Sequence, residues 1–407
     1  MGYRPKYHLT APQGRVSDPC GIALMGETLH VFFQHDPSFP REPQRDGWGH
    51  TATRLGSGTW HHLPPALYPE DALGASLGSV ITREGQTRLF YSRDGTGQHV
   101  MDATAVDGPM GGIYKRREDD PVVEVPEEGI ARNPHVSRGA DGQWRMVVGA
   151  QRANHTGAVV LYTSTDLQRW ELAGEIAFDG LNYNTASAHM WERPNLVRMS
   201  DLATGEILDV LVFCPQFPDS DECGYVVGRL EGARFEVTRD FTPLDYGHEF
   251  FAPHLIPYGG GALAIAWMGL PGRDAVPSLE AEGWAHSLTL VRELSLIDGS
   301  VTASLIIPTE PDMVVERVVL GGAEFNAELV DVAGNVGASV HWQPDFAGRG
   351  TLSLSVDGLV RWAECAEGEL VFVADGCAVE LTAGGGEVAF SSAVFAPGGN
   401  DWAELRF

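Results

Sequence analysis

The sequence predicts an all-β protein, for two reasons. Long helical periodicities are nearly absent from the 407 residues, and short apolar runs recur between Gly, Pro, Asp and Asn turns. The spacing of the runs suits repeated antiparallel sheets. Clear examples are residues 28–35 (TLHVFFQH), 87–93 (TRLFYSR), 143–151 (QWRMVVGAQ), 157–164 (GAVVLYTS), 208–216 (LDVLVFCPQ) and 262–269 (ALAIAWMG).

Two segments of the chain resemble each other. Residues 58–67 (GTWHHLPPAL) and 166–176 (DLQRWELAGEI) each place a Trp and then an apolar pair after an expected β-hairpin. Loose repetition of this kind fits the blades of a β-propeller. The spacing alone does not count blades, and the composition leaves a sandwich or a β-helix open.

The C-terminal quarter has a different pattern. Pro308 and Pro311 mark a linker within residues 297–315, and short alternating strands such as TLSLSV and GELVFVA follow it. This pattern indicates a β-sandwich. The length also exceeds that of a typical single domain, so we expect a large domain over residues 1–300 and a small one over 313–407.

The chain is strongly acidic. Its 28 Lys and Arg residues stand against 55 Asp and Glu residues, a formal charge of −27. Such a charge repels nucleic-acid phosphates and anionic lipid surfaces, so neither nucleic acid nor membrane is an expected partner. The first residues, MGYRPKYHL, lack the apolar core of a signal peptide, and no later stretch reaches the about 18 apolar residues of a membrane span. We therefore expect a cytoplasmic protein.

The cysteines and histidines do not form a recognisable metal motif. The five cysteines are odd in number and scattered, which predicts free structural thiols, and the fourteen histidines show no compact ligand set. The sequence therefore predicts no metal and no cofactor. The cysteines are Cys20, Cys214, Cys223, Cys365 and Cys377.

Two carboxylates are candidates for chemistry. Asp18 lies in residues 15–21 (RVSDPCG), where a turn role is the ordinary interpretation, and Glu192 lies between Trp191 and Arg193 in the WERP segment, where a surface ion pair is the ordinary one. A carboxyl group beside an indole can have its pKa raised by desolvation, as a general acid requires.

Ten segments, in the same order, resemble motifs of glycoside hydrolase family 32, the invertases and sucrose-6-phosphate hydrolases. Together they extend over most of the chain. They are residues 4–21 (RPKYHLTAPQGRVSDPCG), 32–37 (FFQHDP), 46–53 (DGWGHTAT), 60–71 (WHHLPPALYPED), 130–136 (IARNPHV), 161–176 (LYTSTDLQRWELAGEI), 188–196 (AHMWERPNL), 244–254 (LDYGHEFFAPH), 282–296 (EGWAHSLTLVRELSL) and 373–386 (VADGCAVELTAGGG).

The resemblance implies a five-bladed β-propeller with a central funnel, followed by a C-terminal β-sandwich. It also implies a retaining hydrolysis of β-fructofuranosides, in which two carboxyl groups about 5–5.5 Å apart act on the fructosyl unit. Asp18 matches the nucleophile and Glu192 the acid/base. The implied partner is a small saccharide.

Several positions depart from the family pattern. Its third catalytic carboxylate, which stabilises the transition state, is Asn133 here, and the Cys after its acid/base is Arg193. A neutral hydrogen bond contributes about 1 kcal/mol or more less than a charged one, so the change predicts a ten- to thousandfold loss of rate on a standard fructoside. Next to the matched nucleophile, Ser17 and Cys20 replace Asn residues of the family. One loop Trp of the family is missing from residues 38–47 (SFPREPQRDG).

By the same resemblance, seven residues match positions that contact substrate, although at Leu77 a binding Ser has been replaced. For three of them a structural role is the alternative: Gln34 bridging strands, Arg132 pairing with a carboxylate and Trp284 packing in the core. The seven are Ser17, Gln34, Trp48, Leu77, Ser79, Arg132 and Trp284.

The resulting hypothesis is a hydrolase of sucrose, sucrose 6-phosphate or short fructo-oligosaccharides with an altered sugar subsite. Phosphate recognition by basic residues such as Arg41, Arg45 and Arg193 stays open. The first alternative is a catalytically degenerate homologue that binds a saccharide, and the second is a fructosyltransferase that uses the same covalent intermediate. The arabinan-degrading propeller families are a lesser alternative.

Overall fold

The structure is a computed structural model, and it describes residues 2–41, 46–68, 75–93, 99–106, 108, 112–117, 121–124, 130–183 and 187–407. Strands dominate this part of the chain, where the single helix is the short α1 (Pro277–Glu282). The all-β prediction is therefore confirmed. No helix of the described part is long and apolar enough to cross a lipid bilayer.

Residues 14–305 form five sheets. In the order of hydrogen-bonded neighbours, the first sheet is β21 (Trp284–Ala285), β1 (Gly14–Met25), β2 (Thr28–Asp36), β3 (Gly47–Arg54) and β4 (His61–Leu67). The second is β5 (Ala75–Arg83), β6 (Gln86–Arg93), β7 (His99–Ala105) and β8 (Tyr114–Arg116), with β9 (Val123–Glu124) paired to β7. The third is β10 (Ile130–Arg138), β11 (Trp144–Gln151), β12 (Gly157–Ser164) and β13 (Glu171–Glu175). The fourth is β14 (Ala177–Asp179), β18 (Arg234–Pro243), β17 (Gly224–Glu231), β16 (Ile207–Gln216) and β15 (Met190–Ser200). The fifth is β19 (Phe251–Tyr258), β20 (Gly261–Met268), β23 (Arg292–Ile297) and β24 (Ser300–Leu305), with β22 (Ser287–Leu288) paired to β20.

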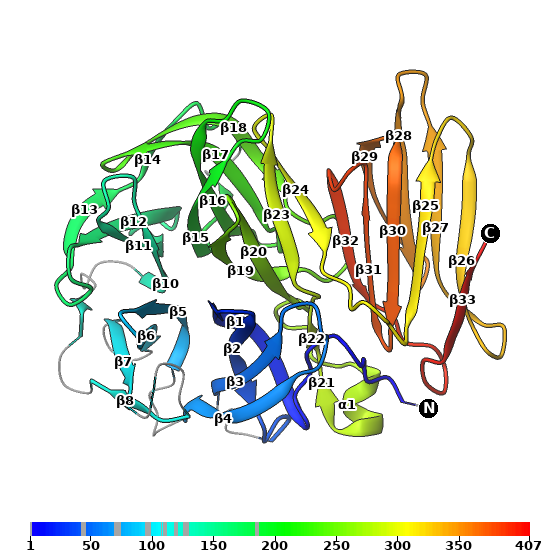
Figure 1. The fold of residues 1–407 in the computed structure, drawn as a ribbon, viewed down its shortest axis with the longest axis horizontal. Coiled ribbons are helices and arrows are strands. Elements are labelled where there is room, and N and C mark those ends of the chain that lie inside the picture. Colours follow the sequence, from blue (N-terminus) through cyan, green and yellow to red (C-terminus); the bar gives the residue numbers. More distant parts are fainter. Residues whose placement is uncertain are drawn as a thin grey trace.

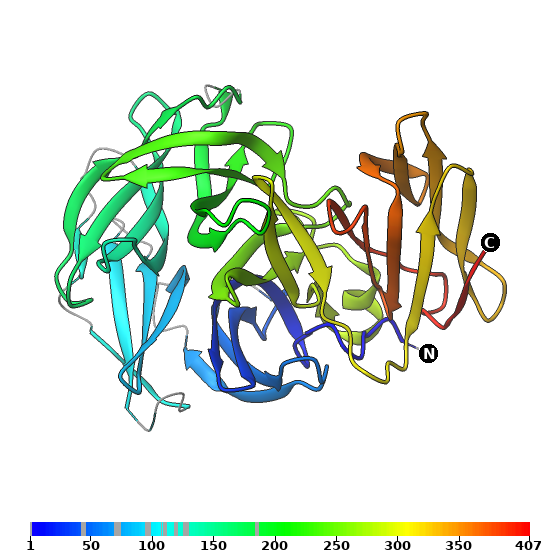
Figure 2. The same cartoon turned by 45° about the horizontal axis from the view of Figure 1, so that its top comes forward.

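Five strands, β1, β5, β10, β15 and β19, close a ring and are called the inner strands below. Each lies beside the next, and β19 lies beside β1 (Figures 1 and 2). Every inner strand pairs antiparallel with the strand that follows it. The five sheets therefore surround one centre, to which each contributes an inner strand.

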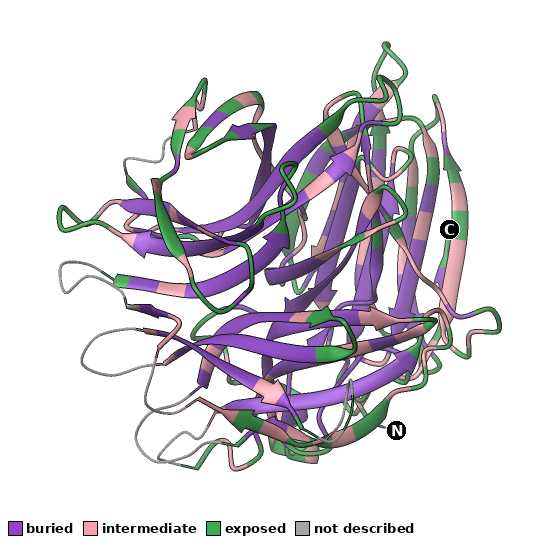
Figure 3. Ribbon diagram, turned by 60° about the vertical axis from the view of Figure 1, so that its left-hand side comes forward, coloured by how far each residue is buried: buried purple, intermediate pink, exposed green. Residues whose placement is uncertain are grey.

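Apolar side chains fill the spaces between neighbouring sheets. One cluster joins the first and second sheets through Phe32, Trp48 and Leu89, and another joins the third and fourth through Val159 and Phe213. The inner strands are buried over most of their length, and exposed residues gather in turns and outer strands (Figure 3). Burial of this apolar surface is the main favourable term that holds the sheets together.

Two further sheets follow in the chain and pack on each other through one common core. The first is β25 (Val314–Leu320), β30 (Gly368–Asp375), β31 (Ala378–Ala383) and β32 (Val388–Ala393). The second is β29 (Leu359–Ala366), β28 (Arg349–Val356), β27 (Val336–Pro344), β26 (Phe325–Asp331) and β33 (Trp402–Arg406). Because β24 reaches Leu305, the segment that joins them to the five sheets is 306–313, shorter than the 297–315 stretch that the sequence suggested.

The six apolar runs singled out from the sequence are all strands, namely β2, β6, β11, β12, β16 and β20. The two similar Trp segments also occupy equivalent places. Trp60 directly precedes β4, the outer strand of the first sheet, and Trp170 directly precedes β13, the outer strand of the third. The loose repeat is thus a repeat of sheet position.

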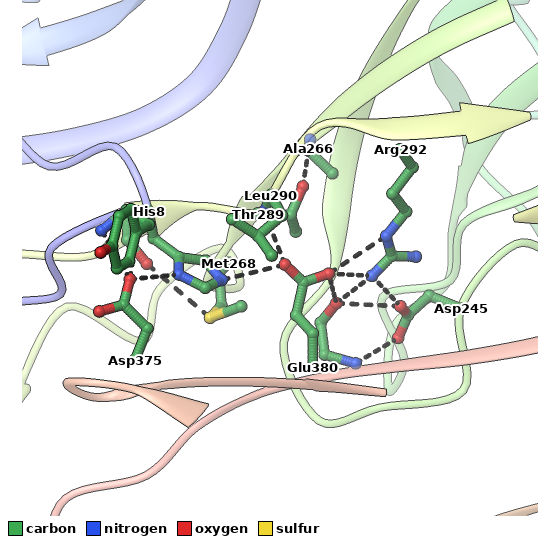
Figure 4. A network of polar contacts seen from close by, with 12 residues as sticks. His8, Asp245, Ala266, Met268, Thr289, Leu290, Arg292, Asp375 and Glu380 are labelled. Atoms are coloured by element: carbon green, nitrogen blue, oxygen red, sulfur yellow. Dashed lines mark hydrogen bonds and ion pairs between the residues drawn. The ribbon is translucent and has the colours of Figure 1, made fainter. Parts of the chain in front are cut away.

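A buried polar network joins the two groups of sheets (Figure 4). Asp375, at the end of β30, accepts hydrogen bonds from the backbone of residues 6–8 and from Nδ1 of His8 at 2.8 Å. Glu380, on β31, binds Nε2 of His8 at 3.0 Å and Nη2 of Arg292 at 2.6 Å. The C-terminal sheets therefore hold the segment that leads into β1.

Candidate active site

All five inner strands carry a β-bulge at the same place along the strand. In four of them a proline stands in the bulge, preceded by Asp18, Asn133, Arg193 or Ala252. Proline has no N–H to give to the ladder, and a bulge is where a strand tolerates it. Asn133, Arg193 and Ala252 have φ values of 63°, 51° and 49°, so the backbone at these bulges leaves the strand conformation. Three of these four residues lie in the site described next.

A single guanidinium group binds both candidate carboxylates. Nη2 of Arg193 lies 2.9 Å from Oδ2 of Asp18, and its Nη1 contacts Oε2 of Glu192. Asp18 lies on β1 and is 4% exposed, whereas Glu192 lies on β15 and is 2% exposed. The structure therefore brings the two predicted catalytic residues together, with the cation between them.

Glu192 has two further donors on its carboxylate. Arg132 contacts Oε1, and Nε2 of Gln216 donates to Oε2 at 2.7 Å. Burial alone would raise the pKa of Glu192, but the positive charges of Arg193 and Arg132 hold it below its usual value. The sequence suggested that desolvation can raise this pKa, but here the effect of burial is outweighed by two guanidinium groups.

Three buried polar atoms of Asp18, Asn133 and Arg193 lack a hydrogen-bond partner within the described part of the chain. They are Oδ1 of Asp18, an acceptor, and two donors, Nδ2 of Asn133 and Nε of Arg193. The backbone N–H of Asn133 donates to Oγ of Ser92 at 2.8 Å, which fixes this bulge against the second sheet. Unpaired buried polar groups are costly, and a hydroxyl-rich ligand can satisfy both a donor and an acceptor.

The other predicted contact residues lie around this centre with varied exposure. Trp48 is fully buried and donates its indole N–H to the carbonyl of Ser76 at 3.1 Å, while Leu77 packs with it in the core between the first two sheets. Ser79 accepts a hydrogen bond from the N–H of Val136 at 3.1 Å. These contacts tie the inner strands together.

Ser17 and Gln34 lie on the first sheet. Ser17 is buried next to Asp18, and Gln34 is half-buried opposite Trp48 in the β2–β3 register. Arg132 pairs with a carboxylate, which was the structural alternative, but that carboxylate is the catalytic candidate Glu192. The binding roles of these residues stay predictions.

Trp284 is held by partners outside this cluster. It is buried on β21, donates its indole N–H to Glu282 at 2.8 Å and lies under the guanidinium of Arg4 at 4.6 Å. Among the described contacts none joins it to Asp18 or Glu192. A core-packing role was its alternative in the sequence, and this placement agrees with it.

Sequence reasoning missed two residues that hydrogen-bond to the candidate site, Gln216 and Ser92. Gln216 ends β16, directly opposite Met190 at the start of β15, so its amide reaches Glu192 across the pair. The signal was the polar residue at the end of the apolar run LDVLVFCPQ. No motif drew attention to Ser92.

The thiols of this protein are not part of the chemistry. All five cysteines are buried and free, as predicted, and burial raises the pKa of Cys20, which lies beside Asp18 in the sequence. A buried neutral thiol is a poor nucleophile.

The described residues contain no cluster of three His, Cys, Asp or Glu side chains suited to a metal ion. Of the arginines considered for phosphate, Arg193 is bound to carboxylates and Arg45 lies outside the described residues.

Comparison with known proteins agrees with this geometry. Residues 8–306 match the model of the glycosyl hydrolases family 32 N-terminal domain. The chain is 33% identical over 322 residues to a sucrose-6-phosphate hydrolase of Klebsiella pneumoniae, covering 73% of this chain and 66% of that protein. It is 32% identical over 314 residues to the sucrose-6-phosphate hydrolase of Bacillus subtilis (strain 168), covering 72% and 63%. The matches thus span less than two thirds of the length of these relatives.

The fold has close counterparts among solved structures. A β-fructofuranosidase mutant of Bombyx mori in complex with sucrose superposes with a TM-score of 0.81 at 26% identity, covering 99% of this chain and 94% of that one. The family model thus covers the inner strands that carry Asp18, Asn133 and Glu192. The chain belongs to glycosyl hydrolases family 32.

Proposed function

We propose that this protein is a retaining hydrolase of β-fructofuranosides. The observation that carries the proposal is the single guanidinium of Arg193 that binds both Asp18 and Glu192. Two carboxylates that share one guanidinium lie close together, which favours the short separation of about 5–5.5 Å in retaining enzymes over the longer one in inverting enzymes. The relatives named sucrose-6-phosphate hydrolases favour sucrose, sucrose 6-phosphate or short fructo-oligosaccharides as substrates.

In the proposed mechanism, Oδ1 of Asp18 is the attacking atom, because Oδ2 is bound to Arg193 and Oδ1 is buried without a partner. It forms a bond to C2 of the fructosyl unit as the glycosidic bond breaks, and water then hydrolyses the covalent intermediate. Glu192 is placed to handle the protons. Asn133 offers a neutral donor where the family has a carboxylate, so the fructose subsite is altered.

The same proposal includes the architecture. The closed ring of inner strands supports a five-bladed β-propeller, and the shared core of the two C-terminal sheets supports a β-sandwich. The division at 1–300 and 313–407 stays a proposal, and the end of β24 at Leu305 favours a slightly later end of the first domain. A cytoplasmic location also stays a prediction.

The test is fructose release by the purified protein from sucrose, sucrose 6-phosphate and 1-kestose, together with mass spectrometry after incubation with an activated fluoro-sugar. We expect release from at least one fructoside and covalent labelling of Asp18. Asp18→Asn is the matched control and should abolish both. Absence of release and of labelling across the panel would overturn the proposal.

A second candidate is a degenerate homologue that binds a saccharide without turnover. It is favoured by the ion pairs that occupy both carboxylates, together with Asn133. Calorimetry then shows sugar binding that is unchanged in Asp18→Asn and Glu192→Gln, with no hydrolysis. A fructosyltransferase is distinguished by its products, because fructose appears on acceptor sugars as the sugar concentration rises.

A further inference from the structure

The hydrogen bonds to the side chain of Glu192 share one property. Arg132, Arg193 and Gln216 each present an N–H to the carboxylate, so both oxygens accept. Arginine has no acceptor atom and does not lose its proton in proteins. Two donors thus occupy Oε2 and one occupies Oε1, so a proton on Glu192 competes with these donors and gains no acceptor from them.

This arrangement suits one of the two roles of an acid/base residue. A general acid must carry a proton before the glycosidic bond breaks, whereas a general base must be ionised before water attacks. The two guanidinium groups stabilise the ionised form of Glu192 and lower its pKa, although the side chain is 3% exposed. The site is therefore prepared for the second step and poorly prepared for the first.

We propose that the site turns over β-fructofuranosides whose leaving group departs as a weakly basic anion, with Glu192 acting only as a base. The inference rests on the proposed retaining mechanism and departs from its favoured substrates, because sucrose, sucrose 6-phosphate and fructo-oligosaccharides all release a sugar alkoxide. A weakly basic oxyanion, such as a phenolate or a phosphate, leaves without being protonated. The glucose of sucrose leaves as a strongly basic alkoxide, which needs a proton as its bond breaks.

The two steps balance without a further reactant. In the first, a lone pair on Oδ1 of Asp18 forms the bond to C2, and the electrons of the C2–O bond leave with the anion. The guanidinium groups of Arg193 and Arg132 lie beside the two carboxylates, and in the proposed step their positive charge stabilises the departing anion. In the second, water attacks C2, its proton passes to Glu192, and the electrons of the C2–Asp18 bond return to the carboxylate.

Arg193 is the residue that decides this outcome. It stands where the family motif has a cysteine, a neutral side chain in the protonated form, and it is the one cation that contacts both carboxylates. Its side chain is 15% exposed, so solvent screens its charge little. Removing it leaves Glu192 with one guanidinium and favours the protonated acid.

The experiment compares kcat/KM for 4-nitrophenyl β-D-fructofuranoside, phenyl β-D-fructofuranoside and sucrose between pH 5 and pH 8. We expect the 4-nitrophenyl substrate to exceed sucrose by at least a hundredfold at pH 7, with the phenyl substrate between them. The kcat/KM for the 4-nitrophenyl substrate should not change with pH, while the kcat/KM for sucrose falls as pH rises. Arg193→Cys should increase kcat/KM for sucrose at pH 7 by tenfold or more. The ratio of kcat/KM for the 4-nitrophenyl substrate to that for sucrose should therefore fall.

Two control variants should keep the ratio of kcat/KM between the 4-nitrophenyl substrate and sucrose high. Arg193→Lys keeps the charge, and Arg317→Cys removes an exposed arginine of β25. Equal rates on sucrose and the aryl substrates in the wild-type protein would overturn the inference and leave the proposed function standing. Cleavage of sucrose, sucrose 6-phosphate or 1-kestose but of neither aryl substrate would overturn the inference alone, and cleavage of none of these substrates would remove the proposed function and the inference with it. Because the wild-type series decides alone, poor folding of Arg193→Cys does not affect the test.

Discussion

In two clusters within the described part of the chain, one arginine binds two carboxylates whose side chains are buried. Where the two groups of sheets meet, Arg292 binds Glu380 at 2.6 Å and Asp245 at 2.9 Å (Figure 4). At the centre of the ring, Arg193 binds Asp18 and Glu192. The chemistry of the two clusters is the same, and they differ in how their remaining polar atoms are satisfied.

Every carboxylate oxygen at the junction accepts a hydrogen bond. Oε1 of Glu380 accepts from the N–H of Leu290 at 2.6 Å as well as from His8, and Oδ1 of Asp245 accepts from the N–H groups of Gly247 and Ser391. The unpaired polar atom there is a donor, Nη1 of Arg292, whose guanidinium lies 4.9 Å from the ring centre of Phe250. Saturated in this way, the carboxylates have no capacity left for a ligand.

At the ring centre, in contrast, Oδ1 of Asp18 and Nδ2 of Asn133 are buried and unpaired. An unsatisfied buried polar group costs about 1–3 kcal/mol, so a structural cluster has reason to avoid it. A binding site can carry this cost because the ligand provides the missing partners. The comparison therefore separates a cluster that stabilises the fold from one that is prepared to react.

The largest expected effect is the loss of activity in Asp18→Asn. The amide cannot form the covalent intermediate, so kcat should fall by about 10⁴-fold or more, equivalent to about 5.5 kcal/mol of barrier. The melting temperature should change by only about 3 °C, because Arg193 keeps its ion pair with Glu192. Activity assays and thermal melts check both halves. If Asp18→Asn lost much stability but kept activity, the cluster at the ring centre would be structural and the prediction would be wrong.

The next largest expected effect is a loss of stability in Glu380→Ala, at the junction between the two groups of sheets. The change leaves Arg292 and His8 buried without one of their partners, and breaking a buried pair in this way costs about 3–5 kcal/mol. The measurement is the free energy of unfolding from urea titration. Glu369→Ala is the matched control, because this exposed glutamate pairs with Arg317 and its loss should cost about 0.5 kcal/mol or less.

The junction should also respond to alkaline pH. Burial alone would lower the pKa of His8, but its bonds to Asp375 and Glu380 outweigh it and raise the pKa to about 9. An unfolded histidine titrates at about 6.5. The stability that His8 contributes is therefore complete below about pH 6.5 and is lost as pH rises through about 9.

Urea titrations at pH 6 and pH 9.5 measure this loss, which should be smaller than the loss from Glu380→Ala. Glu380 itself has a pKa of about 2, lowered by Arg292 and His8 against the effect of burial, so its own contribution persists down to acid pH. In His8→Gln the difference between pH 6 and pH 9.5 should shrink. A stability that rises between these two pH values in the wild-type protein would contradict the prediction.

Much of the fold could be predicted from the sequence because the positions of the strands depend on local residue patterns. Apolar runs between turns marked the strands, and the ordered motifs marked the inner strands that carry Asp18 and Glu192. A sharper signal was present in the bulges, where a Pro or Gly recurs at positions 19, 78, 134, 194 and 253, a spacing of 56 to 60 residues. Because the chain has 49 Gly and 25 Pro residues, this period becomes recognisable only once the structure shows which of them lie in the bulges.

The ion pairs of the site could not be predicted from local residue patterns. In a regular strand, consecutive side chains point to opposite faces, so Glu192 and Arg193 would be expected to lie apart. The bulge and the φ of 51° at Arg193 change its direction and bring it to both carboxylates. This geometry depends on the neighbouring inner strands, as does the lowered pKa of Glu192. The junction also joins residues more than 350 positions apart, such as His8 and Glu380.

The smallest expected effect concerns Asn133→Asp, which restores the carboxylate of the family motif at the centre of the ring. If the site were an ordinary fructosidase that had lost one charge, the restored carboxylate would make charge-assisted hydrogen bonds to sugar hydroxyls and raise kcat/KM on sucrose by tenfold or more, about 1.4 kcal/mol. We expect a change of less than tenfold, because Leu77 and Arg193 alter the same subsite and a third carboxylate adds negative charge beside Asp18 and Glu192. The double variant Asn133→Asp with Arg193→Cys should gain more on sucrose than the two single changes predict together, since loss of the cation favours protonated Glu192 while the restored carboxylate binds the sugar hydroxyls. Steady-state kinetics of the four proteins checks this. A tenfold gain from Asn133→Asp alone would show that the unpaired atoms at the ring centre mark a single lost charge and not a rebuilt subsite.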